Sequence, residues 1–176
     1  MVTERSSALK ALETAIHMEM DGQQFYLEAS RASKNELGRQ LFTSLAAEED
    51  LHRKRFEEIY QAIRQRQDWP GLPLRHDHAL DIKTIFAPAV GRVGGEIKAA
   101  ASELEAIQVA MYKENKSYDF YEERAGKAVY EAEKEYYQAL AAEERHHYLV
   151  LVDYQEYLSD PATWFTNKEH PSLDGG

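Results

Sequence analysis

The chain has 176 residues, of which 43% are hydrophobic and 30% are charged, so it is long enough for one domain with a buried core and short for two. Its formal net charge is −10, and an acidic surface repels nucleic acid phosphates and anionic membranes, so we expect neither as a partner. The chain has no cysteine, which excludes disulfides, thiolate metal sites, iron–sulfur clusters and thiol catalysis.

Apolar residues recur with helical spacing in four long stretches that are rich in good helix formers, and this pattern predicts an all-α fold. The predicted helices cover residues 5–32, 35–65, 102–124 and 129–158. Asn35 is the expected N-cap of the second helix, and Gly126 is the expected end of the third. Because the first two and the last two helices are joined by short links, each pair is predicted to form an antiparallel hairpin.

A longer segment, residues 67–101, connects the two hairpins, and it contains Pro70, Pro73, Pro88 and the Gly94-Gly95 pair. One long crossover between two helical hairpins is a known topology of four-helix bundles. We therefore predict one domain over residues 1–176, with a C-terminal tail at 159–176 that follows the fourth helix.

The two halves of the sequence are related by an internal repeat. A shift of 95 positions places Leu45-Ala46-Ala47-Glu48-Glu49 on Leu140-Ala141-Ala142-Glu143-Glu144 without a gap. The same shift places three further pairs on one another: His52 on His147, Glu19 on Glu114, and Phe25-Tyr26 on Phe120-Tyr121. Each half is therefore predicted to be one helical hairpin, repeated and docked on its partner.

The residues that the repeat retains are concentrated around carboxylates and histidines, which are side chains that bind metal ions. Residues three apart on a helix share a face, so Glu49 and His52 are expected to reach the same point, and Glu144 and His147 repeat this arrangement. Glu19 and Glu114 lie on the apolar stripes of the other two helices. Four buried carboxylates would be very costly without compensation, and two divalent cations would neutralise them. Oxygen and imidazole ligands without sulfur fit iron, manganese or zinc.

Other residues are weaker candidates. Glu48 and Glu143 lie four residues before the two histidines and are alternative ligands. Glu49 and Glu144 align better with the flanking leucines, so we expect Glu48 and Glu143 to face solvent or an adjacent helix. Tyr26 and Tyr121 are expected to pack in the core, with hydrogen bonding to the ligands as the alternative. Four of the remaining histidines are expected at the surface, and the fifth, His146, is expected to point away from the site because it is adjacent to His147; the four are His17, His76, His78 and His170.

At these residues the chain resembles the rubrerythrin-like branch of the ferritin-like superfamily. The resemblance rests on the stretches Leu-Ala-Ala-Glu-Glu-Asp-Leu-His (45–52), Leu-Ala-Ala-Glu-Glu-Arg-His-His (140–147) and Glu-Met-Asp-Gly-Gln-Gln-Phe-Tyr (19–26). It implies a ferritin-like bundle that holds two iron ions, or manganese or a mixed Fe/Mn pair. It also implies that Glu49 and Glu144 bridge the ions, with Glu19, Glu114, His52 and His147 as terminal ligands.

Two features depart from that family. Rubrerythrins that reduce peroxide carry a glutamate three residues after the third-helix ligand, and this chain has Ser117 at that position. They also usually carry a cysteine-ligated rubredoxin domain, which a chain without cysteine does not form. Electrons are therefore expected from an external donor or from Fe(II). Ser117 and its repeat partner Gly22 are both small, and our hypothesis is that they leave room for water, O2 or peroxide between the metals.

The expected function is that of a di-iron oxidoreductase that reduces O2 or hydrogen peroxide. The alternatives are ferritin-type oxidation and storage of iron, and a metal-binding bundle without enzymatic activity. The N-terminal residues lack the basic and apolar regions of a signal peptide, and no apolar run approaches the ~20 residues that cross a bilayer, so we expect a cytoplasmic protein. Tyrosines on the third and fourth helices suggest a homodimer interface.

Overall fold

The computed structural model describes residues 2–65, 68–70, 101–161 and 163–164, and this part of the chain forms an all-α four-helix bundle. The helices are α1 (Val2–Ala32), α2 (Glu36–Arg64), α4 (Ala101–Lys127) and α5 (Glu131–Ser159). No described residue lies in a strand. The predicted fold class is therefore confirmed, whereas most of the predicted crossover and tail lies outside the described residues.

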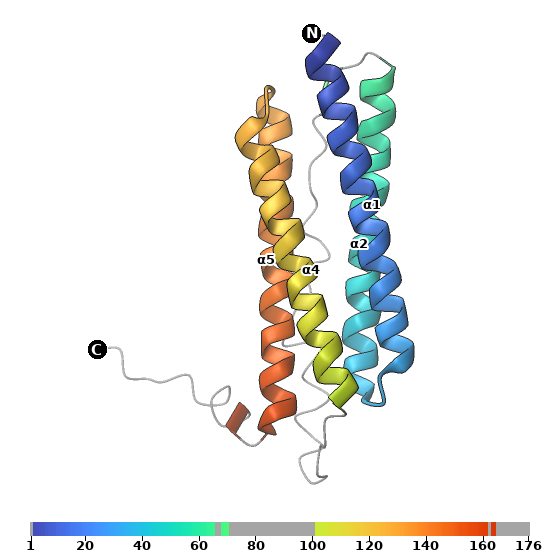
Figure 1. The fold of residues 1–176 in the computed structure, drawn as a ribbon, viewed down its shortest axis with the longest axis vertical. Helices are drawn as coiled ribbons and strands as arrows, with labels where there is room; N and C mark the ends of the chain where they lie inside the picture. The colour runs from blue at the N-terminus through green and yellow to red at the C-terminus, as the bar shows by residue number, and fades with distance from the viewer. Residues whose placement is uncertain (1, 66–67, 71–100, 162, 165–176) are drawn as a thin grey trace, which may run out of the picture.

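The helices pack as two hairpins, α1 with α2 and α4 with α5, whose long axes run side by side (Figure 1). In Figure 1, α1 and α5 run downward, whereas α2 and α4 run upward. Two consecutive helices that run in the same direction need a connection that returns along the whole bundle. This explains why the chain between α2 and α4 is long, whereas the links within the hairpins are short.

The helix ends agree with the sequence prediction in part. Asn35 caps α2, because its side chain accepts a hydrogen bond from the Leu37 backbone N–H at 3.0 Å. The third predicted helix was expected to end before Gly126, but α4 continues to Lys127, and the turn closes with a hydrogen bond from Ala128 N to Ala125 O at 3.4 Å. A glycine without a positive φ is compatible with a helix, so Gly126 does not stop it.

Two apolar clusters fill the bundle, one toward each end, and the polar residues predicted to bind metals lie between them. The cluster at the end with the α1–α2 turn includes Leu41, Phe42, Leu45, Ile107, Leu151 and Tyr154. The cluster at the opposite end includes Leu12, Phe56, Ile59, Tyr121, Tyr137 and Leu140. Both draw on all four helices, so they fix the height at which the polar layer lies. None of the described helices is apolar enough along its length to span a membrane.

A smaller polar cluster joins the two hairpins near the α1–α2 turn. The Ser33 and Tyr154 hydroxyls both donate hydrogen bonds of 2.6 Å to Oε1 of the buried Glu103 carboxylate. Gly38 packs directly against this cluster: a Cβ atom there would lie 2.3 Å from Glu103 Oε1 and 2.3 Å from the Tyr154 hydroxyl. Glycine at this position is therefore required by close approach, although it weakens the helix by roughly 1 kcal/mol relative to alanine.

Alanine substitutions at Gly38 and Gly126 should have opposite effects. Nothing lies within 4 Å of a Cβ at Gly126, so Gly126→Ala should raise the free energy of unfolding by about 0.5–1 kcal/mol through helix propensity. Gly38→Ala should lower it by about 1–3 kcal/mol because the Glu103 hydrogen bonds must shift. Urea unfolding of both variants in the same metal state measures the difference. Equal stabilisation by both substitutions would contradict the close packing at Gly38.

Candidate metal centre

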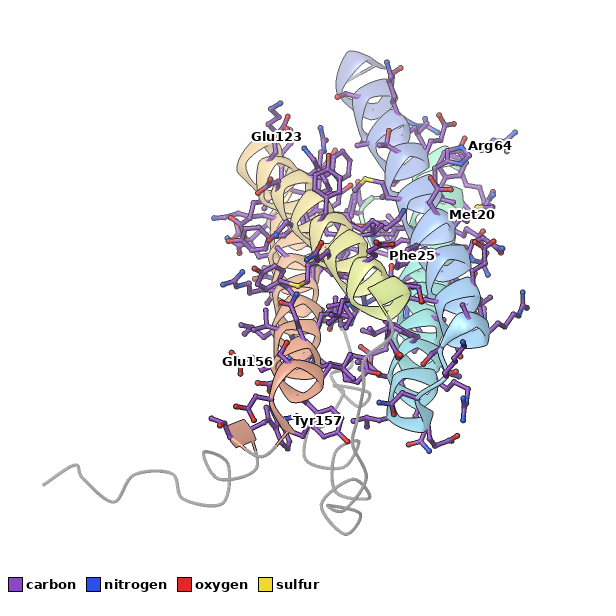
Figure 2. The ribbon with its side chains drawn as sticks, turned by 60° about the horizontal axis from the view of Figure 1, so that its bottom comes forward. Met20, Phe25, Arg64, Glu123, Glu156 and Tyr157 are labelled. Carbon is purple, nitrogen blue, oxygen red and sulfur yellow. The ribbon has the colours of Figure 1, made fainter. Side chains whose placement is uncertain are left out.

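The six predicted ligands meet at mid-height in the bundle, and every helix contributes at least one of them. Glu19 comes from α1, Glu49 and His52 from α2, Glu114 from α4, and Glu144 and His147 from α5. All six side chains are buried, with exposed fractions of 4% or less. By contrast, the adjacent residue Met20 lies on the outer side of α1 and is 46% exposed (Figure 2). The helical register therefore points the carboxylate at position 19 inward.

The ligand atoms form two overlapping groups. One group consists of Glu19, Glu49, His52 and Glu144, and the other of Glu49, Glu114, Glu144 and His147. Within each group the ligand atoms lie within 4.8 Å of one another. Glu49 and Glu144 belong to both groups, whereas each of the other four residues belongs to one. Two positions that share two carboxylates are the arrangement expected for a pair of bridged ions.

Among the residues that the structure describes, the atoms that face the centre have no hydrogen-bond partner. Seven such atoms come from the six residues: Glu19 Oε2, Glu49 Oε1, His52 Nδ1, Glu114 Oε2, both Glu144 carboxylate oxygens and His147 Nδ1. Buried polar atoms are nearly always paired, and leaving one unpaired costs about 1–3 kcal/mol. Seven unpaired atoms that converge on one point therefore indicate a group that binds there.

The spacing of these atoms fits a cation. His52 Nδ1 lies 3.4 Å from Glu19 Oε2 and 3.4 Å from Glu144 Oε1. In the other group, His147 Nδ1 lies 3.4 Å from Glu114 Oε2 and 3.5 Å from Glu49 Oε1. Two ligands that are each about 2.1 Å from one ion, at right or tetrahedral angles, lie about 3.0–3.4 Å apart. The residues present therefore fit two metal ions.

The outward-facing atoms of the same residues are held by side chains of the opposite hairpin. Tyr26 of α1 donates a hydrogen bond to Glu114 of α4, and Tyr121 of α4 donates one to Glu19 of α1. Each terminal carboxylate is thus fixed by a tyrosine from the other half of the repeat. We had expected these tyrosines to serve core packing, with hydrogen bonding as the alternative, and the structure places them in both roles.

The histidines are oriented in the same crossed manner. His52 Nε2 lies 2.6 Å from Glu143 Oε2 of α5, and His147 Nε2 lies 2.7 Å from Glu48 Oε2 of α2. A ring that donates Nε2–H to a carboxylate presents Nδ1 as a free lone pair toward a metal. Glu48 and Glu143 thus contact the adjacent helix, which was one of the two expected placements. Their shared 95-residue offset was the sequence signal for this role.

Burial and mutual repulsion raise the pKa of the shared carboxyl groups. Burial, followed by the Glu114 carboxylate, raises the pKa of Glu144 to about 7. Burial, followed by the Glu19 carboxylate, raises the pKa of Glu49 well above its ordinary value. These are the two groups that both metal positions share, so they are the ones with the most negative surroundings. Without a cation, the centre lowers its charge by retaining protons.

The two imidazoles also retain protons in the absence of a cation. Burial alone would lower the pKa of His52, but the Glu19 carboxylate and the hydrogen bond to Glu143 outweigh it and raise the pKa well above the ordinary value. For His147, the effect of burial is likewise outweighed by Glu114, and the pKa is raised. Metal binding must displace these protons, because only a neutral imidazole offers a lone pair.

The hypothesis about small residues needs a correction at Gly22. A Cβ atom at this position would lie 2.7 Å from Glu49 Oε2 and 3.2 Å from Glu49 Cδ. The space that a side chain would take is therefore occupied by the shared carboxylate rather than left open for an oxidant. Ser117, its repeat partner, is partly buried. Of the four histidines expected at the surface, His17 is exposed and the other three lie outside the described residues. His146, expected to point away from the site, is partly buried and belongs to neither group of ligand atoms.

The sequence model of the Rubrerythrin family matches residues 10–153, which include α2, α4, most of α1 and α5, and the whole centre. The chain belongs to the rubrerythrin family. Neither a curated protein nor a solved structure matched it. The family match and the buried carboxylate and histidine groups together support a metal-binding site in this member of the rubrerythrin family.

Removing an outer carboxylate should weaken metal binding without removing a ligand. Glu143→Ala frees the His52 ring, so we expect Mn(II) affinity to fall about 10- to 100-fold. Glu135→Ala is the matched control, because Glu135 is an exposed glutamate on the same helix. Competition with a chromophoric chelator measures both affinities. Equal affinities for the two variants would show that the contact at 2.6 Å does not orient the ring.

Metal affinity should rise with pH. Glu144, whose pKa is raised to about 7, and the two histidines are protonated at low pH and must lose their protons before they bind an ion. Below these pKa values, each displaced proton should add about tenfold to the affinity per pH unit. Mn(II) titrations between about pH 6 and pH 8 test the sign, and calorimetry in two buffers counts the protons released. An affinity that falls with rising pH would contradict the assignment.

Proposed function

We propose that this rubrerythrin-family protein binds two iron ions, or a mixed Fe/Mn pair, and reduces hydrogen peroxide or O2 with electrons from an external donor. The observation that supports this most strongly is the set of seven inward atoms without hydrogen-bond partners, arranged in two groups that share Glu49 and Glu144. When bound, the metals would supply the redox chemistry and polarise the oxidant. The protein supplies charge, geometry and a site buried away from solvent.

The chain's own residues account for the charge balance of such a site. Four inward carboxylates carry a charge of −4 when ionised, which two divalent cations would neutralise. Glu19 and Glu114 are held by tyrosine hydroxyls, so each has one oxygen left for a metal. Oxygen and nitrogen ligands without sulfur are typical of sites that bind iron or manganese. The chain has no cysteine, so a thiolate-ligated iron centre within it is excluded as the electron donor.

The metal content of variants tests the binding half of this proposal. The wild-type protein, loaded anaerobically with Fe(II), should hold two ions per chain by elemental analysis. Glu144→Ala should lose both ions because Glu144 belongs to both groups, whereas His147→Ala should lose one. His17→Ala, which removes an exposed histidine, is the control and should retain two. Retention of two ions by Glu144→Ala would overturn the shared-carboxylate arrangement.

Reaction of the iron-loaded protein with peroxide tests the other half. We expect each chain to oxidise its two Fe(II) ions much faster than free Fe(II), and an added one-electron reductant to sustain turnover. His147→Ala should lose this rate and His17→Ala should keep it. Uptake of many more irons than two per chain would favour ferritin-type storage instead. A protein that binds iron but consumes neither peroxide nor O2 would be a binding bundle.

The proposal includes a cytoplasmic homodimer. Val109 and Tyr112 on α4 and Leu149 on α5 are large apolar side chains with exposed fractions of 46%, 63% and 46%. Exposed apolar groups of this kind are typical of surfaces that pack against another protein. Light scattering of the purified protein would distinguish a dimer from a monomer.

A further inference from the structure

The two tryptophans of the chain, Trp69 and Trp164, are 95 positions apart and therefore belong to the internal repeat. Each follows the end of the second helix of its hairpin and packs back against the bundle. Trp69 is 6% exposed and lies in the cluster with Tyr121, whereas Trp164 is 7% exposed and lies in the cluster with Tyr26. The repeat thus places one easily oxidised indole at each end of the molecule.

Aromatic rings connect the metal centre to Trp69 without a gap. Tyr121 donates its hydroxyl hydrogen bond to the terminal ligand Glu19. Its ring stacks on Tyr137, with ring centroids 6.1 Å apart, and the Tyr137 ring lies 5.8 Å from the Trp69 ring. This series, Tyr121–Tyr137–Trp69, is called the Trp69 path below.

A related series leads to the opposite end. Tyr26, bound to Glu114, is followed by Phe42, Tyr154, Tyr157 and Trp164, with consecutive centroids 6.2, 6.1, 6.3 and 5.6 Å apart. Tyr157 is labelled at the lower end of α5 in Figure 2. Phe42 occupies the repeat position of Tyr137. In both halves an aromatic ring therefore follows the tyrosine that contacts the centre, with a hydroxyl in one half and without one in the other.

We propose that the Trp69 path carries single electrons from a donor at the end of the bundle to the metal centre. This rests on the proposed function, which supplies the oxidant at the centre. Trp69 and Tyr121 are the two groups that are oxidised and reduced in turn. The Tyr137 ring lies between them and is not itself oxidised. A phenol gives up an electron readily only when its proton can leave, and among the described residues nothing accepts a hydrogen bond from the Tyr137 hydroxyl.

Electrons and protons balance at each step. An oxidising equivalent formed from peroxide at the centre takes one electron from Tyr121, and the phenol proton passes along the hydrogen bond to Glu19. Trp69 then returns one electron to Tyr121 across the Tyr137 ring, and the proton returns from Glu19. The indole radical cation left at Trp69 takes one electron from an external one-electron donor. Two such passages supply two electrons, which together with two protons taken up from solvent reduce one hydrogen peroxide to two water molecules.

The first experiment tests the path without iron chemistry. Zinc-loaded protein with Trp164→Phe has Trp69 as its one indole, which azide radicals from pulse radiolysis oxidise. We expect the tryptophanyl absorbance to convert to tyrosyl absorbance at a rate independent of protein concentration, by electron transfer from Tyr121 to Trp69, which is the reverse of the proposed flow across the same rings. Tyr137→Leu should lose this conversion, whereas Tyr137→Phe should keep it. Phe56→Leu removes another ring that contacts Tyr121 and should also keep it. Conversion that survives Tyr137→Leu, or is lost in Tyr137→Phe, would overturn the bridging role.

The second experiment uses the iron-loaded protein and keeps the proposal testable if Tyr137→Leu does not fold. After one equivalent of peroxide, we expect oxidation products at Trp69 by mass spectrometry. In Trp69→Phe, a tyrosyl radical should persist longer by electron paramagnetic resonance. No oxidation at Trp69 and an unchanged radical lifetime would overturn the path. If the iron-loaded protein ignores peroxide altogether, the proposed function fails, and the zinc experiment still decides whether the path conducts.

Discussion

Four carboxylates are buried at one height in the bundle, beside two imidazoles. The surrounding residues compensate for this concentration of negative charge. In an apolar interior, ionised carboxyl groups so close together are strongly unfavourable. The protein reduces the cost in the metal-free state by proton retention at Glu49 and Glu144, whose pKa values are raised. Hydrogen bonds reduce the cost only in part: tyrosine hydroxyls donate to Glu19 and Glu114, whereas among the described residues neither Glu144 oxygen has a hydrogen-bond partner. The inward carboxylate oxygens without partners are therefore available to bind cations.

The crossed contacts explain how two hairpins with a long connection hold such a site in register. Each terminal carboxylate and each histidine is held by a residue of the opposite hairpin, through Tyr26, Tyr121, Glu48 and Glu143. Sliding or rotating one hairpin would break all four contacts together. Apolar packing above and below sets the height of the layer, whereas these polar contacts specify which atoms face the centre. The same four contacts therefore orient the candidate ligands and determine how the two hairpins dock.

The bundle and the residues of its centre were predictable because the repeat and the helical period both constrain them. Glu49 and His52 share a face at any reasonable helix geometry, and the flanking leucines favoured Glu49 over Glu48. The outer contacts were harder, because the partner of Glu48 lies on another helix, and periodicity within one helix says nothing about rotation against its neighbour. Gly22 was misinterpreted for a similar reason: a small residue on an inward face signals close approach, but the sequence does not say which group approaches.

The two halves carry the same candidate ligands but differ in the residues that surround them. The two groups of ligand atoms are therefore similar without being identical in their surroundings. The six candidate ligands are three pairs of identical residues at the 95-residue offset. The next layer is freer: Gly22 packs against Glu49 where the other half has Ser117, and Tyr137 stands where the other half has Phe42. A side chain at position 22 would meet the Glu49 carboxylate, whereas the repeat position carries the serine side chain. The repeat therefore gives the two groups of ligand atoms the same residue types but different neighbours, so the surroundings of Glu49 and Glu144 are not equivalent.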